Sequence, residues 1–422
     1  MRGVSGLDSH LLIIGASARA AAFSALRAGL QPRSVDLFAD LDLQARCPVQ
    51  RLTRNYPRGF EDVIRADLPG PWMYTGALEN YPRLIGGWQQ LRELWGVRSE
   101  CLRWARDPVS IARVLGHHDL PCPRTLLQPP TEEGRRWLVK PLRGAGGAGI
   151  REWTAADSPP PGRVYWQEYI DGQPAAAIYL SPIWNHVFFL GLTRQLVGLP
   201  WLHAAPFQYC GSIGPVRTRG QLRDELEGLG KAVGIGLGPR LTGLFGVDGI
   251  LAGGHFWPVE VNPRYTASVE VLEYATGRRH LALHRSAFDR GDYDMPKDAT
   301  VTRGFVGKAI LYAPHDLTFP ADGPWLSELR SPMPLDVAPD FADIPAPGEL
   351  IPRGRPVLTF FVCKATLDAC EDALRVIADD LTRRLFPDLP AANEARSQAT
   401  DARIVSSPDR FLPGRPNDGD PR

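Results

Sequence analysis

The chain has 422 residues, of which 44% are hydrophobic and 23% are charged. This length is typical of about two to four domains, and it can bury a core large enough to fold without disulfide or metal staples. The 48 basic and 47 acidic residues leave a formal net charge of +1, which argues against a general binder of nucleic acid or anionic membranes, because such proteins carry a basic excess.

Lysine is rare and occurs only at positions 140, 231, 297, 308 and 364. A coding preference for arginine explains the totals but leaves open what each remaining lysine does. The six cysteines form no C-x-x-C pair, which favours reduced thiols in a cytoplasmic protein over a zinc or redox motif. The first residues, MRGVSGLDSH, are not typical of a signal peptide, and no run of about 18 apolar residues predicts a membrane helix.

The first elements predict a βαβ unit. Residues 11–14 indicate a buried strand, 20–28 a helix that ends at Gly29, and 35–39 a second strand of a parallel sheet. The turn between strand and helix, G-A-S-A-R-A, has one glycine where the dinucleotide fingerprint requires three. We therefore expect a Rossmann-like domain without a dinucleotide, and an oxidoreductase that uses residues 10–40 is the lesser alternative.

A third strand, at 72–74, ends just before the polar residues Glu79 and Asn80. Strand ends of open α/β sheets carry ligand contacts. An ordinary turn and helix cap gives the same pattern, so both interpretations of this segment stay open.

The remaining pattern alternates strands and helices. We expect helices at 109–115, 220–233 and 367–386, and loops at 126–135 and 155–163. Expected strands are 137–142, 165–170, 175–180, 186–192, 245–251, 256–262, 306–312 and 357–363. Beyond about residue 390 the chain is polar and rich in Pro, Asp and Arg, which predicts a disordered tail.

A lysine and a run of glycines follow one of these strands. Residues 140–150 read KPLRGAGGAGI, so Lys140 ends a strand shortly before four glycines. Glycines let backbone N–H groups approach phosphates closely, and the lysine adds a point charge. The order excludes a Walker A loop, in which the lysine follows the glycines. The pattern favours a flexible glycine lid over phosphates more than a plain linker.

A predicted hairpin carries acids on one face. Asp248 lies on its first strand, and Glu260 and Asn262 lie two residues apart on the second, so their side chains share a face. Two carboxylates and an amide oxygen are hard ligands suited to Mg²⁺ that carries nucleotide phosphates. Arg264 follows closely and can bind a phosphate as a fork. A solvated hairpin face is the weaker alternative.

These motifs, in this order, resemble the ATP-grasp superfamily over about residues 100–285. They are V-K-P with the glycine lid, Q-E-Y-I-D-G at 167–172 as a hinge, and V-D-G-I with V-E-V-N-P-R as a metal hairpin. Taken alone, the hinge segment is weak, because an ordinary strand and turn explains it as well. The segments 13–29, 74–85, 207–215 and 307–314 are similar to those of predicted ATP-dependent carboligases related to biotin carboxylase.

The resemblance implies a role for each motif. Phosphates would contact Lys140 and the glycine lid of Gly144, Gly146, Gly147 and Gly149. The adenine would contact Glu168 and the backbone of Tyr169 and Ile170. One or two Mg²⁺, with Mn²⁺ as an alternative ion, would bind Asp248, Glu260 and Asn262. Arg264 would bind phosphate or an acyl phosphate, and with Lys140 it would act in catalysis.

Two positions depart from the family pattern. Many members carry a ribose-binding carboxylate about seven residues after the hinge glutamate, where this chain has Ala175. Many also carry an earlier lysine, where this chain has Arg106, which we expect to supply that charge at the nucleotide site. These departures concern the ribose contact more than catalysis.

The implied fold is α/β, with α+β character in the C-terminal part. A Rossmann-like pre-ATP-grasp domain (1–100) would precede an ATP-grasp domain (101–390) with a glycine-lid subdomain at about 120–166, and 391–422 would form the tail. Candidate substrate contacts are Glu79, Asn80, Tyr209, Ser212, Ser268 and Glu270. His203, His280 and His284 are expected to be packing or capping residues.

The implied activity is an ATP-dependent ligation of a small-molecule carboxylate to an amine, or to a thiol, through an acyl phosphate. Such chemistry depends on positioning and on neutralising phosphoryl charge, and it needs no nucleophilic side chain. A role in one-carbon coenzyme biosynthesis is a further hypothesis. The main alternative is an ATP-binding regulatory or inactive member, and a phosphotransferase is a lesser one. We expect no nucleic-acid or membrane partner, and homo-oligomerisation stays open.

Overall fold

The computed structural model describes residues 10–67, 69–132, 134–154, 158, 160–182, 186–236, 240–288 and 304–389. The chain divides into two compact units, residues 1–375 and 376–422. The predicted tail at 391–422 lies outside the described residues, and the predicted boundary after residue 100 stays a prediction. No helix in the described part of the chain is long and apolar enough to span a membrane.

The N-terminal segment forms a parallel four-stranded sheet in the order β3-β2-β1-β4. Its strands are β1 (His10–Ile14), β2 (Gln31–Asp36), β3 (Val49–Arg51) and β4 (Trp72–Tyr74). Helix α1 (Arg19–Arg27) connects β1 to β2, which confirms the predicted βαβ unit. The second strand was placed too late in the sequence, because residues 37–39 turn back and the carboxylate of Asp36 accepts the N–H groups of Phe38 and Ala39.

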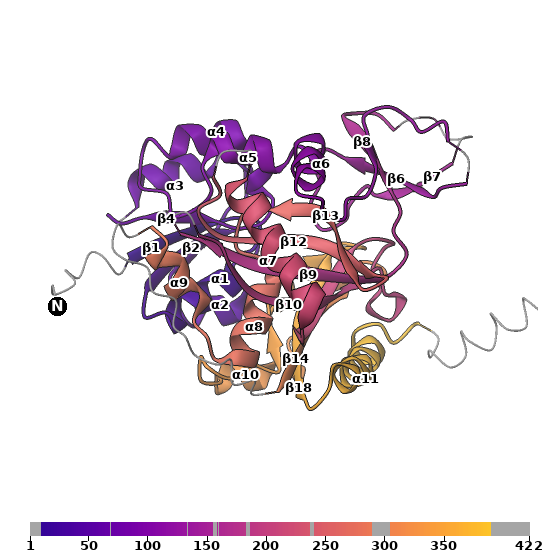
Figure 1. Cartoon of the computed structure of the whole chain (residues 1–422). Helices are drawn as coiled ribbons and strands as arrows, with labels where there is room; N and C mark the ends of the chain where they lie inside the picture. Colours follow the sequence, from indigo (N-terminus) through magenta and orange to yellow (C-terminus); the bar gives the residue numbers. More distant parts are fainter. Residues whose placement is uncertain are drawn as a thin grey trace, which may run out of the picture. The chain divides into compact units, whose positions relative to one another are not determined.

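Short helices complete the N-terminal segment (Figure 1). They are α2 (Leu41–Gln44), α3 (Phe60–Ala66), the 3₁₀ turn η2 (Leu78–Asn80), α4 (Pro82–Trp88) and α5 (Ser99–Ala105). Helix α6 (Pro108–His117) follows and confirms the helix predicted at 109–115. Asp107 caps it, since its carboxylate accepts the N–H of Val109 at 3.3 Å.

The central sheet has eight antiparallel strands in the order β13-β12-β9-β10-β11-β14-β18-β16. The strands are β9 (Gln173–Ser181), β10 (Phe188–Val197), β11 (Tyr209–Val216), β12 (Gly243–Ala252), β13 (His255–Asn262), β14 (Phe305–Tyr312), β16 (Phe341–Ala342) and β18 (Pro356–Lys364). Six of these were predicted. Strand β11 was missed because its segment contains two glycines and a proline, and β16 was missed because it has only two residues.

Two helices cover opposite faces of this sheet. Tyr179 in β9 faces α7 (Gly220–Ile235), where its hydroxyl donates to the Leu226 carbonyl at 2.9 Å. The adjacent Ile178 packs in a cluster with Val269 and Leu272 of α8 (Ala267–Thr276). Neighbouring residues of a strand point to opposite faces, so α7 and α8 enclose the sheet between them.

A smaller antiparallel sheet, in the order β5-β8-β6-β7, occupies the range predicted for the lid, and we call it the lid sheet (Figure 1). Its strands are β5 (Thr125–Leu126), β6 (Trp137–Pro141), β7 (Arg151–Trp153) and β8 (Val164–Glu168). Trp137, Val139 and Trp166 form its own small core. The glycine segment connects β6 to β7, as a lid over a ligand requires.

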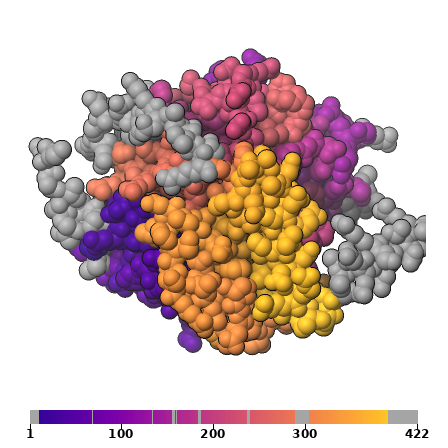
Figure 2. Space-filling view, turned by 90° about the horizontal axis from the view of Figure 1, so that it is seen from below, coloured from indigo at the N-terminus to yellow at the C-terminus, as the bar shows by residue number. Residues whose placement is uncertain are grey.

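The remaining elements belong to the C-terminal half and to short turns. They are η3 (Pro200–Leu202), α9 (His280–Ser286), β15 (Leu317–Thr318), α10 (Leu326–Arg330), β17 (Leu350–Ile351) and α11 (Leu367–Leu385). On the face shown in Figure 2, the orange segment beyond residue 304 lies beside the indigo N-terminal segment. The N–H of Leu41 donates to the Ile344 carbonyl at 2.9 Å across this contact.

Buried ion pairs connect helix α1 to helix α8. Arg19 Nη1 lies 2.6 Å from Glu270 Oε1, and Arg27 Nε lies 3.1 Å from Glu273 Oε2. Lys308 in β14 reaches Glu270 Oε2 at 2.7 Å. Burial alone would raise the pKa of Glu270, but Arg19 and Lys308 outweigh it and lower that pKa to about 2. The first helix is thereby fixed to the central sheet.

Candidate functional site

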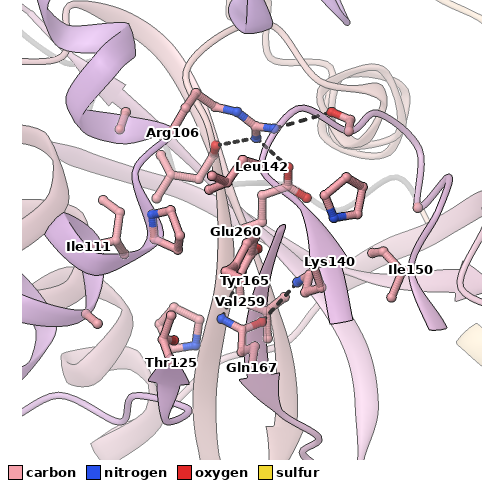
Figure 3. A pocket seen from close by; sticks show the side chains of 18 of the residues that line it. Arg106, Ile111, Thr125, Lys140, Leu142, Ile150, Tyr165, Gln167, Val259 and Glu260 are labelled. Carbon is pink, nitrogen blue, oxygen red and sulfur yellow. Dashed lines mark hydrogen bonds and ion pairs between the residues drawn. The ribbon is translucent and has the colours of Figure 1, made fainter. Parts of the chain in front are cut away.

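One cavity of about 420 Å³ gathers most of the predicted site residues. It lies between the β12–β13 hairpin, the lid sheet, the glycine segment and the start of α8. The predicted residues that line it are Glu79, Lys140, Gly144, Gly146, Gly147, Glu168, Tyr169, Ile170, Tyr209, Asp248, Glu260, Asn262, Arg264 and Ser268. A smaller pocket of about 60 Å³ shares Lys140, Gly144, Gly147 and Glu260 with it and adds Arg106 (Figure 3).

The hairpin brings its two acids together. Asp248 and Glu260 are direct partners in the β12–β13 ladder. Asn262 Nδ2 donates to Asp248 Oδ2 at 2.7 Å, and Gln195 Nε2 donates to Asp248 Oδ1 at 2.9 Å. Burial and the nearby Glu260 charge raise the pKa of Asp248 to about 6. The predicted face is therefore formed, with two neighbouring carboxylates on it.

Arg106 supplies an internal cation to this face. Its Nη1 pairs with Glu260 and lies 3.3 Å from the Val261 carbonyl oxygen, while its Nη2 lies 3.3 Å from both Asn80 Oδ1 and the Gly144 carbonyl oxygen (Figure 3). Burial would raise the pKa of Glu260, but Arg106 and Lys140 outweigh it and hold that pKa below its usual value. Arg106 thus joins the hairpin to the glycine segment.

The donor set fits a magnesium ion that also binds phosphate oxygens. Mg²⁺ in proteins takes one or two carboxylates together with substrate phosphates. Asp248, Glu260 and the Asn262 amide offer such oxygens, and burial with the nearby Glu260 charge raises the pKa of Asp248. No group of three or more His, Cys, Asp or Glu side chains suited to a metal occurs among the described residues.

Lys140 sits at the end of β6, almost buried at 6% exposure. Its Nζ donates to Gln167 Oε1 at 2.9 Å and lies 5.8 Å from the centre of the Tyr165 ring (Figure 3). Strand pairing between β6 and β8 places Lys140 opposite Tyr165. The ammonium is therefore held in a fixed position at the border of both pockets.

The glycine segment is docked against the chain before β11. Gly146 and Gly147 have φ values of +61° and +82°, a region that favours glycine. The Gly146 carbonyl oxygen accepts the N–H of Tyr209 at 3.2 Å, and a Cβ on Gly147 would lie 1.9 Å from the Phe207 carbonyl oxygen. This close approach requires glycine at position 147.

Replacing Gly147 with alanine is expected to weaken nucleotide binding by at least about 10-fold, because backbone strain of about 1–3 kcal/mol adds to the clash with Phe207. Titration calorimetry with ATP and Mg²⁺ measures the change. Gly146→Ala is the matched comparison, since Gly146 also has positive φ but a Cβ there would meet nothing within 4 Å. Equal losses in the two variants would show that the close approach has no special role.

Arg264 is oriented by a buried glutamate. Its Nε donates to Glu79 Oε1 at 2.7 Å, and its Nη2 donates to Asn262 Oδ1 at 3.2 Å. Glu79 is 1% exposed. Asn80, the other polar residue after β4, does not line the cavity and instead donates from Nδ2 to the Gly144 carbonyl oxygen at 3.0 Å. The two residues after β4 therefore support the arginine and the lid.

The hinge residues line the cavity, but the Glu168 carboxylate already has partners. It pairs with Arg135 and accepts the Arg124 N–H at 3.3 Å. The Arg136 guanidinium lies 3.9 Å from the centre of the Tyr169 ring. The adenine contact assigned to Glu168 stays a prediction, and it requires sharing this carboxylate with Arg135.

The other predicted substrate residues divide into two groups. Tyr209 and Ser268 line the cavity, whereas Ser212 lies behind them, with its Oγ 2.9 Å from Tyr209 Oη and 3.3 Å from Ser268 Oγ. Glu270 lies outside the cavity lining because Arg19 and Lys308 occupy its carboxylate. Gly149 also lies outside the lining, packed on Pro141.

The three histidines singled out in the sequence, and Ala175, have structural roles. Burial lowers the pKa of both His280 and His284 to about 4, and His284 Nδ1 accepts the N–H of Leu244 at 2.9 Å. His203 adopts a left-handed conformation at the end of η3, with φ +56°. Ala175 is fully buried in β9 between β10 and β12, so no side chain at this position reaches a ribose.

Sequence reasoning missed several polar residues of the site. Gln195 and Gln167 hold Asp248 and Lys140, and Thr266 starts the helix that borders the cavity. An amide inside the apolar strand of residues 188–197 was a usable signal for Gln195. Among the described residues, no partner reaches the buried atoms Glu79 Oε2 and Thr266 Oγ1, and both residues line the cavity.

Comparison with known proteins finds a family model for part of the chain and several similar folds. A family model described as an ATP-grasp domain matches residues 105–268. The fold is similar to L-amino acid ligase from Bacillus licheniformis, with 18% identity, TM-score 0.62, and coverage of 88% of this chain and 97% of that one. No curated protein sequence matches the chain.

Two further structures share the fold. The biotin carboxylase domain of Hydrogenobacter thermophilus 2-oxoglutarate carboxylase, solved with MgADP and bicarbonate, has 13% identity, TM-score 0.63, and coverage of 86% and 88%. N5-carboxyaminoimidazole ribonucleotide synthetase from Thermotoga maritima has 14% identity, TM-score 0.60, and coverage of 87% and 97%. At these identities the likeness concerns the fold, and it confirms the predicted fold class.

Proposed function

From the ATP-grasp domain that residues 105–268 form, we propose that this chain is an ATP-dependent ligase that joins a carboxylate to an amine. The observation that carries the proposal is the single cavity lined by Lys140, Asp248, Glu260, Asn262 and Arg264. Two cations, two carboxylates and an amide on one cavity wall suit a metal-bound triphosphate better than any neutral ligand.

Each group has a place in the proposed reaction. Lys140 and the glycine segment hold the phosphates, and Asp248, Glu260 and Asn262 hold Mg²⁺, for which Mn²⁺ can substitute. When bound, Mg²⁺ neutralises charge on the phosphate oxygens. Arg264, held by Glu79 at 2.7 Å, orients the transferred phosphoryl group. Arg106 neutralises Glu260 and anchors the glycine segment through the Gly144 carbonyl oxygen.

The reaction has two steps. A carboxylate oxygen attacks the γ-phosphorus and ADP leaves, which forms an acyl phosphate. The amine nitrogen then attacks the acyl carbon, loses a proton, and releases phosphate. A thiol can take the place of the amine in the second step. Both steps depend on holding reactants in line and on fixed positive charge, which the buried Lys140 and Arg264 provide.

The similar structures support this class of reaction. The first is an amino acid ligase by name, and the biotin carboxylase domain was solved with MgADP and bicarbonate. We propose the substrate region between Arg264, Tyr209 and Ser268, next to the unpartnered oxygens of Glu79 and Thr266. The proposal includes a cytoplasmic location and a role in one-carbon coenzyme biosynthesis, and it leaves homo-oligomerisation open.

A phosphate-release screen of carboxylic acids against amines, with ATP and Mg²⁺, tests the proposal. ADP and phosphate are expected only when a matching acid and amine are both present, with a product whose mass equals acid plus amine minus water. Phosphate release that persists when the metal is chelated contradicts the proposal. If the chain binds ATP but turns over no acid–amine pair, the regulatory alternative is favoured. A phosphorylated product would favour a phosphotransferase.

A further inference from the structure

A second cavity, of about 310 Å³, lies where strands β1 and β2 end. Ligands of open α/β sheets bind at the carboxyl ends of the strands. Ser17, Phe38 and Asp40 line it from the N-terminal segment, and residues 343–359 close it from the C-terminal half. No residue that lines the candidate functional site lines this cavity. Its volume is within the range of small-molecule sites.

Asp40 lies in this cavity without a counter-ion. The residue is 6% exposed, and it precedes helix α2 without a side-chain cap bond. Across the described part of the chain, no group forms a hydrogen bond or ion pair with its carboxylate. Burial, with the charges of Asp343, Asp42 and Asp36, raises the pKa of Asp40 well above its usual value. A buried carboxyl of this kind is normally paired.

The neighbouring acids do have partners, which sets Asp40 apart. Asp36 accepts the N–H groups of Ala18, Phe38 and Ala39. Asp42 accepts the N–H groups of Asp343 and Ile344 at 3.2 and 3.1 Å.

The charge of buried Arg19 opposes this rise of the Asp40 pKa, but its guanidinium is bonded to other acids. It donates to Glu270 at 2.6 Å and to Asp343 at 2.9 Å. At the rim, Arg51 pairs with Glu349 at 2.6 Å. Asp343 and Glu349 also line the cavity but have these partners, so Asp40 is the acid of the lining whose carboxylate no described residue pairs with. Arg355 lines the cavity as well, and it is exposed.

The β1–α1 turn is poorly suited to a phosphate. Three of its N–H groups are bonded internally, from Gly15 to the Val35 carbonyl, from Ala16 to the Gly76 carbonyl, and from Ala18 to Asp36. A dinucleotide would need these groups free, and its phosphates would meet the acidic cluster. The structure therefore opposes the oxidoreductase alternative and favours a cationic ligand.

The rest of the lining is largely apolar. Phe38, Ile310, Val357 and Leu358 form it, and Leu350 lies at the mouth with 76% of its surface exposed. No cluster suited to a metal ion occurs in the described ranges. We propose that this cavity binds a small molecule that carries an ammonium group on an apolar body, with Asp40 as the counter-ion of the ammonium.

Binding of simple amines to the full chain tests this site. The probes are hexylamine, phenethylamine and tryptamine, each compared with the alcohol of the same skeleton, by titration calorimetry near neutral pH. At least one amine is expected to bind one per chain and more tightly than its alcohol. Asp40→Asn should weaken that amine by about 30-fold and leave the alcohol unchanged, because it removes one partner of a buried charge pair.

Two further variants keep the test independent of folding. Asp62→Asn, on the exposed face of α3, is the matched control and should bind as the parent chain does. Leu350→Lys adds a positive charge at the exposed mouth and should weaken the amine severalfold. The proposal is overturned if no amine binds, if amine and alcohol bind equally, if Asp40→Asn keeps the preference, or if ATP with Mg²⁺ competes with the amine.

Discussion

Replacing Glu260 with glutamine is expected to lower phosphate release by at least about 100-fold. Loss of a residue that only supports a metal ligand reduces metal affinity or activity by about 10–100-fold, so loss of a ligand itself should do more. The variant keeps the shape of the side chain but removes the charge that faces Arg106 and Lys140. Arg106, 12% exposed in its side chain, is then left without its carboxylate partner.

Steady-state phosphate release over a range of Mg²⁺ concentrations measures this effect. The loss should be partly relieved by high Mg²⁺ if the glutamate binds the metal. Glu152→Gln is a suitable control, because Glu152 lies in the lid and pairs with Arg136 but is half exposed and outside the cavity. Normal turnover by Glu260→Gln, with an unchanged Mg²⁺ requirement, would contradict the assigned role and with it the proposed activity.

Replacing Lys140 with arginine should reduce turnover by at least about 10-fold, although the charge is kept. The ammonium sits in a narrow place between Gln167 and Tyr165, at 2.9 Å and 5.8 Å. A planar guanidinium is larger and directs its donors in a fork, so it cannot occupy the same position. Lys140→Met removes the charge and should lower turnover by about 10²–10³-fold, as the loss of one fixed charge-stabilising donor typically does.

Separate measurement of ATP binding and of turnover distinguishes the two effects. We expect Lys140→Arg to affect turnover more than affinity, since the misplaced charge still attracts phosphate. Lys364→Arg is the matched control, because Lys364 is exposed at the end of β18 and should tolerate the change. If Lys140→Arg is as active as the control, the rarity of lysine in this chain carries no information about this position.

Local patterns in the sequence were sufficient to predict where the motif residues lie. The alternation of side chains along a strand placed Asp248, Glu260 and Asn262 on one face, and the ladder confirms their pairing. The Lys140 position followed from a strand signal just before the glycines. Both inferences depend on geometry within about fifteen residues, where the period of a strand leaves few alternatives.

Long-range contacts were not predictable in the same way. Arg106 meets Glu260 across 154 positions of sequence, and Arg264 meets Glu79 across 185. No periodicity connects such residues, so Glu79 and Asn80 could only be singled out as polar groups at a strand end. The same limit explains Glu270, whose acidic side chain suggested substrate binding until its pairing with Arg19 and Lys308 was known.

Helix α1 presents two arginines to α8, and these contacts make the folding of the N-terminal sheet depend on later parts of the chain. A fragment that ended near residue 100 would contain Arg19 and Arg27 but would lack Glu270 and Glu273. Arg19 would keep only its 3.8 Å contact with Asp42. Breaking a buried ion pair by removing one partner destabilises a protein by about 3–5 kcal/mol, a large part of the total stability of a small domain. The N-terminal sheet is thus a poor candidate for an independent folding unit, in keeping with the compact unit that extends to residue 375.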